Sequence, residues 1–263
     1  MSRITFSLLR GVEENVAGLL AHLQSRNSSP TGEQAIDVLL TCPSTAFNRS
    51  LFITHMQQLY NASTSFDCQT IVNIVPRVEG TSSSSSDSYR PLTKRDMTFA
   101  AGFDPVYNYV AVGGTFDRLH SGHKLLLTVS ALHTFDKLRV GITGPELLTK
   151  KKFAEKLESF ETRKRNVETF LRLLRSDDDL ELELEPIEEF SGGTDRIAGV
   201  EALCASPETL PAIPKINALR RERQLNDIVA IPIYFVGGDT PSVSSSRLRE
   251  LESQRDQEKS TAN

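Results

Sequence analysis

The residues of this chain that could do chemistry gather at positions 110–124, which read VAVGGTFDRLHSGHK. Gly113 and Gly114 allow the backbone to turn sharply where an apolar strand ends, and they leave main-chain N–H groups open to an anion. His120 and His123 follow, and the serine between them can cap a helix. The first turn of such a helix attracts phosphate through its free N–H groups and its dipole. The segment therefore predicts a phosphate site that both imidazoles can reach.

Spacing alone leaves the role of the two histidines open. Two histidines three residues apart are often packed or solvated side chains, or two ligands of a metal, although no third metal ligand is obvious here. The lysines at 150–152 and the serines at 244–246 are also ambiguous, because a lysine run is usually a solvated surface and a serine is a common helix cap. The glycine-rich strand exit, together with all these motifs in one chain, favours the phosphate site.

The sequences of these motifs resemble those of a known family. GGTFD followed by HxGH is similar to the signature of a nucleotidyltransferase superfamily, and VGGTFDRLHxxHK resembles the eukaryotic and archaeal phosphopantetheine adenylyltransferases. The likeness covers about residues 107–252, whereas residues 188–195 depart from the aspartate-proline run of the family. Further motifs that resemble the family, in the same order, lie at residues 160–163, 206–209, 216–220 and 244–249.

The resemblance implies transfer of AMP from ATP to 4′-phosphopantetheine, giving dephospho-coenzyme A and pyrophosphate in coenzyme A biosynthesis. Mg²⁺ would accompany ATP, held largely by phosphate oxygens and water. The residues expected to be catalytic are His120, His123, Lys151 and Arg220. Those expected to bind ATP are Gly113, Gly114, Thr115, Phe116, Gly122, His123, Ser244, Ser245, Ser246 and Arg249. The acceptor is expected to meet Thr115, Asp117, Lys151 and Asn217, with Lys151 fitting the phosphates better than Lys150 or Lys152.

The implied chemistry needs no general base. A phosphate monoester has a second pKa of about 6 and is already an anionic nucleophile near neutral pH. Positioning and charge stabilisation then suffice. Two alternatives stay open: another member of the superfamily, either a nicotinamide mononucleotide adenylyltransferase or a cytidylyltransferase, and a nucleotide-binding regulator without turnover. A class I aminoacyl-tRNA synthetase is disfavoured, because the chain has no KMSKS-like loop, and the absence of a GxxxxGK[ST] loop argues against an additional kinase.

Alternating strands and helices must position these residues. The pattern predicts strand-helix-strand-helix-strand over residues 4–76 and a second alternation that begins with a strand at 107–112. We therefore expect an α/β protein in which a smaller N-terminal α/β domain of unknown role precedes a Rossmann-like parallel-sheet nucleotidyltransferase domain. The serine-rich residues 80–88 are too polar to bury a core. The expected boundaries are 1–79 for the first domain, 80–103 for a linker or loop, 104–252 for the second domain and 253–263 for a polar tail.

Composition excludes several other classes of function. The chain has 263 residues, 30 Lys+Arg against 34 Asp+Glu and a net charge of −4, which disfavours a nucleic-acid partner. Its apolar runs fall short of the roughly 20 residues that cross a membrane, so no membrane partner is expected. Cys42, Cys68 and Cys204 are far apart and form no CxxC, which favours a reducing compartment. With no signal-peptide pattern, we expect the cytoplasm. Oligomeric state and feedback by coenzyme A are left open by the sequence.

Overall fold

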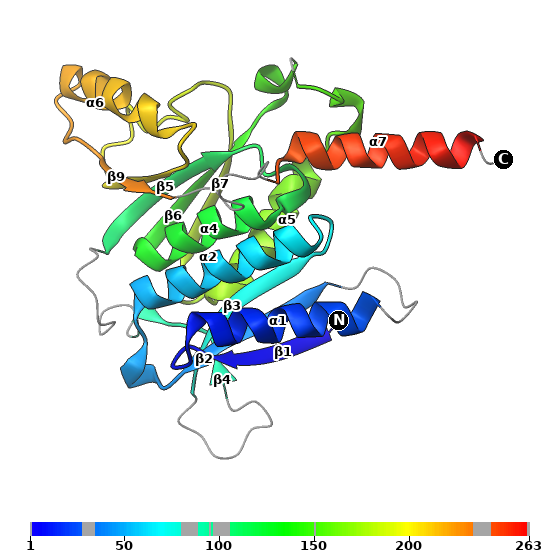
Figure 1. The fold of residues 1–263 in the computed structure, drawn as a ribbon. Coiled ribbons are helices and arrows are strands. Elements are labelled where there is room, and N and C mark those ends of the chain that lie inside the picture. The colour runs from blue at the N-terminus through cyan, green and yellow to red at the C-terminus, as the bar shows by residue number, and fades with distance from the viewer. Residues whose placement is uncertain are drawn as a thin grey trace.

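The computed structural model describes residues 2–27, 35–79, 89–94, 96, 106–149, 151–233 and 243–261, which form two sheets (Figure 1). The first sheet has the order β1-β2-β3-β4, parallel except for β4. Its strands are β1 (Ser2–Ser7), β2 (Ile36–Cys42), β3 (Val72–Glu79) and β4 (Tyr89–Arg90). Between them lie α1 (Val12–Asn27), the short turn η1 (Ser44–Ala46) and α2 (Arg49–Phe66). The predicted strand and helix order of this unit is confirmed.

The second sheet is fully parallel, with the order β7-β6-β5-β8-β9. Its strands are β5 (Tyr107–Gly114), β6 (Thr134–Thr143), β7 (Glu181–Ile187), β8 (Ala202–Ala205) and β9 (Val229–Pro232). The helices are α4 (Ser121–His133), α5 (Phe160–Leu174), α6 (Ile213–Glu222) and α7 (Ser245–Thr261), with short turns η2 (Asp117–Leu119), η3 (Pro145–Leu148), η4 (Ala154–Lys156) and η5 (Leu210–Ala212). Strand order reverses between β5 and β8, and such a switch point is where open parallel sheets bind ligands. The expected Rossmann-like fold is confirmed.

Local sequence explains the elements that carry this sheet. Helix α5 buries Val167, Phe170, Leu171 and Leu174, which recur at helical spacing and therefore share one face. Its first turn is capped by Ser159, whose side chain accepts a hydrogen bond from the backbone of Thr162. The buried face of α5 packs against β6 and β7 of the second sheet and against β3 of the first.

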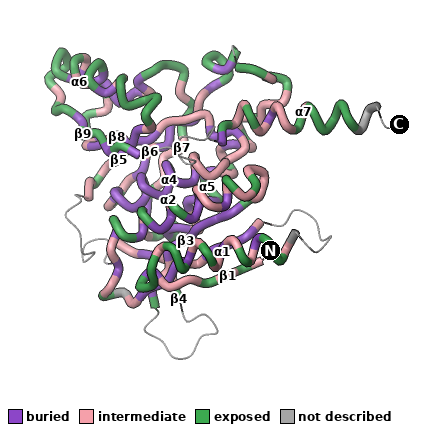
Figure 2. Tube along the Cα trace, in the orientation of Figure 1, coloured by how far each residue is buried: buried purple, intermediate pink, exposed green. Residues whose placement is uncertain are grey.

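One apolar cluster runs through both sheets. Met56 and Leu59 of α2 belong to the same buried cluster as Leu127 of α4 and Phe170 of α5. Helices α2 and α4 lie side by side in Figure 1, and buried chain continues from one unit into the other in Figure 2. The N-terminal unit is therefore packed, through α2 and β3, against α4 and α5, the helices that contact the second sheet.

Two elements fall within the expected linker and tail, whose boundaries stay predictions. The strand β4, which lies within the expected linker, pairs with β3, and Leu92 is fully buried in the core. Residues 80–88 are outside the described part of the chain, so the serine-rich linker stays a prediction. Helix α7 continues through much of the expected polar tail and projects away from the body in Figure 1. None of the helices in the described ranges is long and apolar enough to cross a membrane.

Candidate active site

A cavity of about 590 Å³ opens at the carboxyl ends of the central strands of the second sheet. It is the place where the strand order reverses, as the fold requires. The structure brings together most of the residues that the sequence singled out. Those that line the cavity are Gly113, Gly114, Thr115, His120, Gly122, His123, Lys151, Ser244, Ser245, Ser246 and Arg249.

Phe116 explains why a glycine stands at position 114. The Phe116 backbone is left-handed, with φ of 53°, and its buried ring folds back under the turn. A Cβ on Gly114 would lie 3.1 Å from the Cζ atom of that ring, so the ring would have to shift by a few tenths of an ångström to admit it. The ring also lies 5.3 Å from the imidazole of His123, centroid to centroid. Phe116 is not among the residues that line the cavity, so it supports His123 from behind instead of meeting ATP as expected.

The two histidines stack on one another at the cavity wall. Their ring centroids are 3.8 Å apart with an interplanar angle of 23°, and neither buried Nδ1 atom has a hydrogen-bond partner among the described residues. Burial, and then the charge of Lys124, lowers the pKa of His120 to about 4. Burial, His120 and Lys151 lower the pKa of His123 well below 6.5. Both imidazoles are therefore neutral near pH 7, and each has a buried Nδ1 atom that makes no hydrogen bond within the described residues.

Helix α4 begins beside these rings without a side-chain cap. Its N-cap residue is His120, whose carbonyl accepts the backbone N–H of Lys124 at 3.0 Å. Ser121 was expected to cap the helix, but it is the first helical residue and its Oγ accepts from Thr64 Oγ1 at 3.3 Å. The first-turn N–H groups thus remain available to an anion in the cavity.

The carboxyl ends of β5 and β6 are joined by Arg163. This side chain is 2% exposed, and its Nη1 donates to the carbonyls of Thr115 at 2.7 Å and Thr143 at 3.0 Å. Its Nε donates to the carbonyl of Glu158. The arginine in the 160–163 motif therefore fixes the spacing of the strand ends that face the cavity.

Asp117 is not among the residues that line the cavity. Its carboxylate is fully buried, pairs with Arg249 and Arg118, and accepts the backbone N–H of Glu158 at 2.9 Å. Its carbonyl accepts from Ser245 Oγ at 2.8 Å. Because the polar atoms of Asp117 are already bonded within the protein, the structure does not support the expected contact with the acceptor. Asp117 instead holds the start of α7 through Ser245 and Arg249.

Arg249 lines the cavity, but its guanidinium already bonds to other residues of the protein. It is 1% exposed, pairs with Asp117, and donates to the carbonyl of Lys152 at 3.1 Å and to Ser246 Oγ at 3.0 Å. It therefore ties the serine segment and the lysine segment to the turn after β5.

Arg220 and Asn217 face away from the cavity. Arg220 is fully buried and donates to backbone carbonyls of Thr194, Ile197, Ala198, Val200 and Asn226. Asn217 donates to the carbonyl of Ile228 and accepts its N–H. The structure does not support the expected phosphate role of Arg220 or the acceptor role of Asn217, because their polar atoms bond to neighbouring backbone. Arg220 instead holds the loop that forms one cavity wall.

Replacing Arg220 by Gln should destabilise the protein by about 1–3 kcal/mol, because buried carbonyls lose their donors. A urea unfolding curve measures this loss. The neighbouring Arg221 is exposed and pairs with Asp227, so Arg221→Gln should leave the free energy of unfolding almost unchanged. Equal midpoints for both variants would mean that the loop carbonyls do not depend on Arg220.

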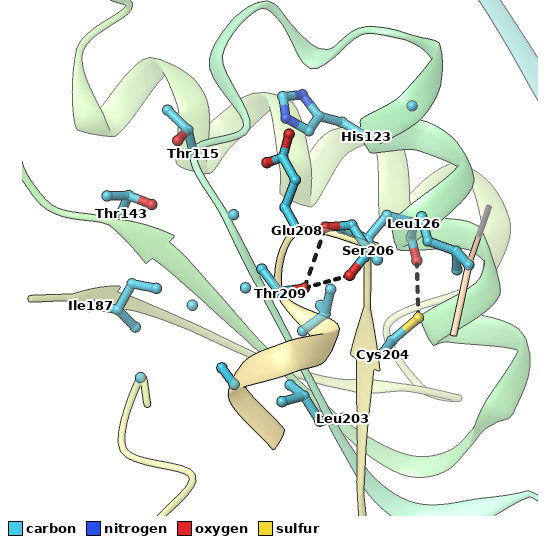
Figure 3. A pocket seen from close by; sticks show the side chains of 18 of the residues that line it. Thr115, His123, Leu126, Thr143, Ile187, Leu203, Cys204, Ser206, Glu208 and Thr209 are labelled. Atoms are coloured by element: carbon cyan, nitrogen blue, oxygen red, sulfur yellow. Dashed lines mark hydrogen bonds between the residues drawn. The ribbon is translucent and has the colours of Figure 1, made fainter. Parts of the chain in front are cut away.

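Several cavity residues were missed by sequence reasoning. Arg139, Gly141 and Thr143 alternate along β6 and share its cavity face, a periodicity that could have identified them once the strand was placed. Glu208, in a motif already noted, points toward Thr115 and His123 in Figure 3. The remaining missed wall is largely apolar and includes Ile187, Phe190, Leu203, Ala212 and Ile216.

The fold, with its cavity at the switch point of the parallel sheet, is that of a nucleotidyltransferase. The chain belongs to the cytidylyltransferase-like family, whose model matches residues 111–251. It is 36% identical over 149 residues to the phosphopantetheine adenylyltransferase of Saccharomyces cerevisiae, a match that covers 57% of this chain and 48% of that protein. The chain thus spans about half the length of the yeast relative.

Archaeal relatives are matched over most of their length. The phosphopantetheine adenylyltransferase of Methanopyrus kandleri is 39% identical over 144 residues, covering 54% of this chain and 89% of that protein. The protein of the same name from Methanothermobacter thermautotrophicus is 35% identical over 147 residues, covering 56% of this chain and 85% of that protein. The family expected from the motifs is confirmed.

Proposed function

We propose that this protein transfers the AMP group of ATP to 4′-phosphopantetheine, forming dephospho-coenzyme A and pyrophosphate. The observation that carries the proposal is the pair of stacked, neutral imidazoles beside an uncapped helix start, in a chain related to proteins with that name. Lys151 and the serines at 244–246 line the same cavity from separate segments. Together they supply hydrogen-bond donors and positive charge for a triphosphate.

In the proposed reaction, a phosphate oxygen of the acceptor attacks the α-phosphorus of ATP. The bond from that phosphorus to the oxygen bridging to the β-phosphate breaks, and pyrophosphate leaves. His120 and His123 donate hydrogen bonds to phosphate oxygens whose negative charge grows during the transfer. Lys151 adds positive charge between donor and acceptor. No side chain needs to remove a proton, because the attacking oxygen is already ionised.

Mg²⁺ is proposed to arrive with ATP and to neutralise part of the phosphate charge. The described residues contain no group of three or more His, Cys, Asp or Glu side chains that could hold a metal. The carboxylate of Glu208 points into the cavity, while that of Asp117 is already paired with Arg249. Mg²⁺ prefers oxygen ligands and retains waters, so the triphosphate and water would supply most of its coordination.

The acceptor can be tested by pyrophosphate release with ATP and a panel of acceptors. We expect turnover with 4′-phosphopantetheine and none with pantetheine, whose neutral hydroxyl would need a base. The rate should fall as the pH drops through about 6, where the acceptor phosphate takes up its second proton. The histidines should not add to this fall, because the pKa of His120 is already lowered to about 4 and that of His123 lies well below 6.5.

Two results would contradict the proposal. Equal or faster turnover with nicotinamide mononucleotide would assign the protein to another acceptor, since that compound carries a phosphate of similar acidity and differs in shape. Absence of pyrophosphate with every acceptor would favour a regulator that binds nucleotide without turnover.

The apolar cavity wall formed by Ile187, Phe190 and Ile216 supports an acceptor with an apolar arm.

A further inference from the structure

Within the described part of the chain, the N-terminal unit makes two polar contacts with α4, the helix that starts after His120 and contains His123. Lys124, the residue after His123, sends its ammonium into the first sheet, where Nζ donates to the carbonyl of Val72 at 3.0 Å. Thr64 Oγ1 donates to Ser121 Oγ at 3.3 Å. Both contacts attach to the first turn of α4, the turn that faces the cavity.

Lys124 is an unusual residue to bury between two units. Only 4% of it is exposed, and an ammonium is costly to bury unless nearby groups compensate its charge. Burial lowers the pKa of Lys124 to about 8, and the charge of Asp37 on β2 opposes that shift. Asp37 is itself held by Asn73 Nδ2 at 2.9 Å. The first sheet therefore supplies both the carbonyl and the carboxylate that keep this lysine in place.

The same ammonium acts on the active site through its charge. Lys124 helps to lower the pKa of His120, while Asp117 opposes that effect. Of the other elements packed around Lys124, β2 contributes Asp37, and α5 contributes the ring of Phe170 at 6.0 Å. A positive charge held at this place favours neutral imidazole and favours an anion at the helix start.

We propose that the N-terminal unit is a scaffold of the nucleotide site. The Val72 carbonyl and Asp37 fix the ammonium of Lys124, and Lys124 holds the first turn of α4 so that His120 and His123 face the phosphates. Lys124 is thus a positioning residue that touches no substrate. The inference rests on the proposed use of ATP, and it assigns a role to a unit whose described residues do not line the cavity.

The test compares Lys124→Met with Arg77→Met in the full chain. Arg77 is a matched control, because it also crosses the interface to a backbone carbonyl, that of Leu173 at the end of α5, at 2.8 Å. The readouts are the Kd for an unreactive ATP analogue, the imidazole titration of His120 by NMR, and the KM for the acceptor. Lys124→Met should raise the Kd for the analogue about tenfold, the scale expected when the charge at a helix start is disturbed. It should also raise the pKa of His120 and leave the acceptor KM unchanged.

Arg77→Met should lower the midpoint of unfolding without changing either binding or the titration of His120. If both variants lose stability but keep wild-type analogue binding and His120 titration, Lys124 is only a packing contact and the inference is wrong. Should Lys124→Met fail to fold, Thr64→Val removes the second contact at low cost, and a Kd for the analogue unchanged from wild type would overturn the inference. Analogue binding and imidazole titration need no turnover, so a wrong acceptor would leave this test intact.

Discussion

Replacing His123 by alanine should lower turnover about 10²–10³-fold while the protein keeps its fold, as for removal of one donor to a developing negative charge. The imidazole lines the cavity, stacks on His120 and rests on Phe116. Its Nδ1 atom bonds to no described residue, so the hydrogen bonds of the fold do not depend on it. Initial rates of pyrophosphate release measure the loss, and a thermal unfolding curve checks that the fold is retained.

The matched control is His22→Ala. His22 lies on α1 in the first unit and contacts Ser2 Oγ at 3.1 Å, away from the cavity. It should leave turnover unchanged. His120→Ala should behave like His123→Ala. The two rings are stacked and are proposed to serve one phosphate group, so the double variant should lose less transition-state stabilisation than the sum of the two single losses. Near-normal turnover of His123→Ala would remove the histidine from the site.

Local sequence was sufficient to predict the frame of the site. The alternation of strands and helices indicates a parallel sheet, and parallel strands place their carboxyl ends on one edge. Gly113 is near the end of β5, Thr115 directly follows that strand, and His123 is in the first turn of the next helix, α4. Their convergence with the serines at 244–246 therefore follows from topology. The motifs in these positions then identify the family.

Long-range burial could not be predicted in the same way. Arg220 and Asp117 have the charges of ligand-binding residues, and a motif does not reveal whether a guanidinium meets a phosphate or a ring of carbonyls. Asp117 and Arg249 are separated by 132 positions, so their pairing depends on how α7 packs against the turn after β5. Lys124 is similar, because its partner carbonyl, that of Val72, belongs to the other sheet.

Asp117→Ala should destabilise the protein by about 3–5 kcal/mol, the cost of leaving a buried charge without its partner. Both side chains of the Asp117–Arg249 pair are almost fully buried, at 0% and 1% exposure. Removing the carboxylate leaves the buried guanidinium of Arg249 without its counter-charge. It also leaves the backbone N–H of Glu158 without its acceptor. Urea unfolding of Asp117→Ala against the wild type measures the loss.

The exposed pair Arg247–Glu250 on the same helix provides the control, because its side chains are 53% and 41% exposed. Glu250→Ala should cost far less, since an exposed pair gains little in water. Combining Asp117→Leu with Arg249→Met should recover much of the stability, because both charges of the buried pair are removed together. Turnover should nevertheless stay low in that double variant, since Arg249 no longer anchors Ser246 beside the cavity. If Asp117→Ala were no less stable than Glu250→Ala, the pair would not hold α7 to the site.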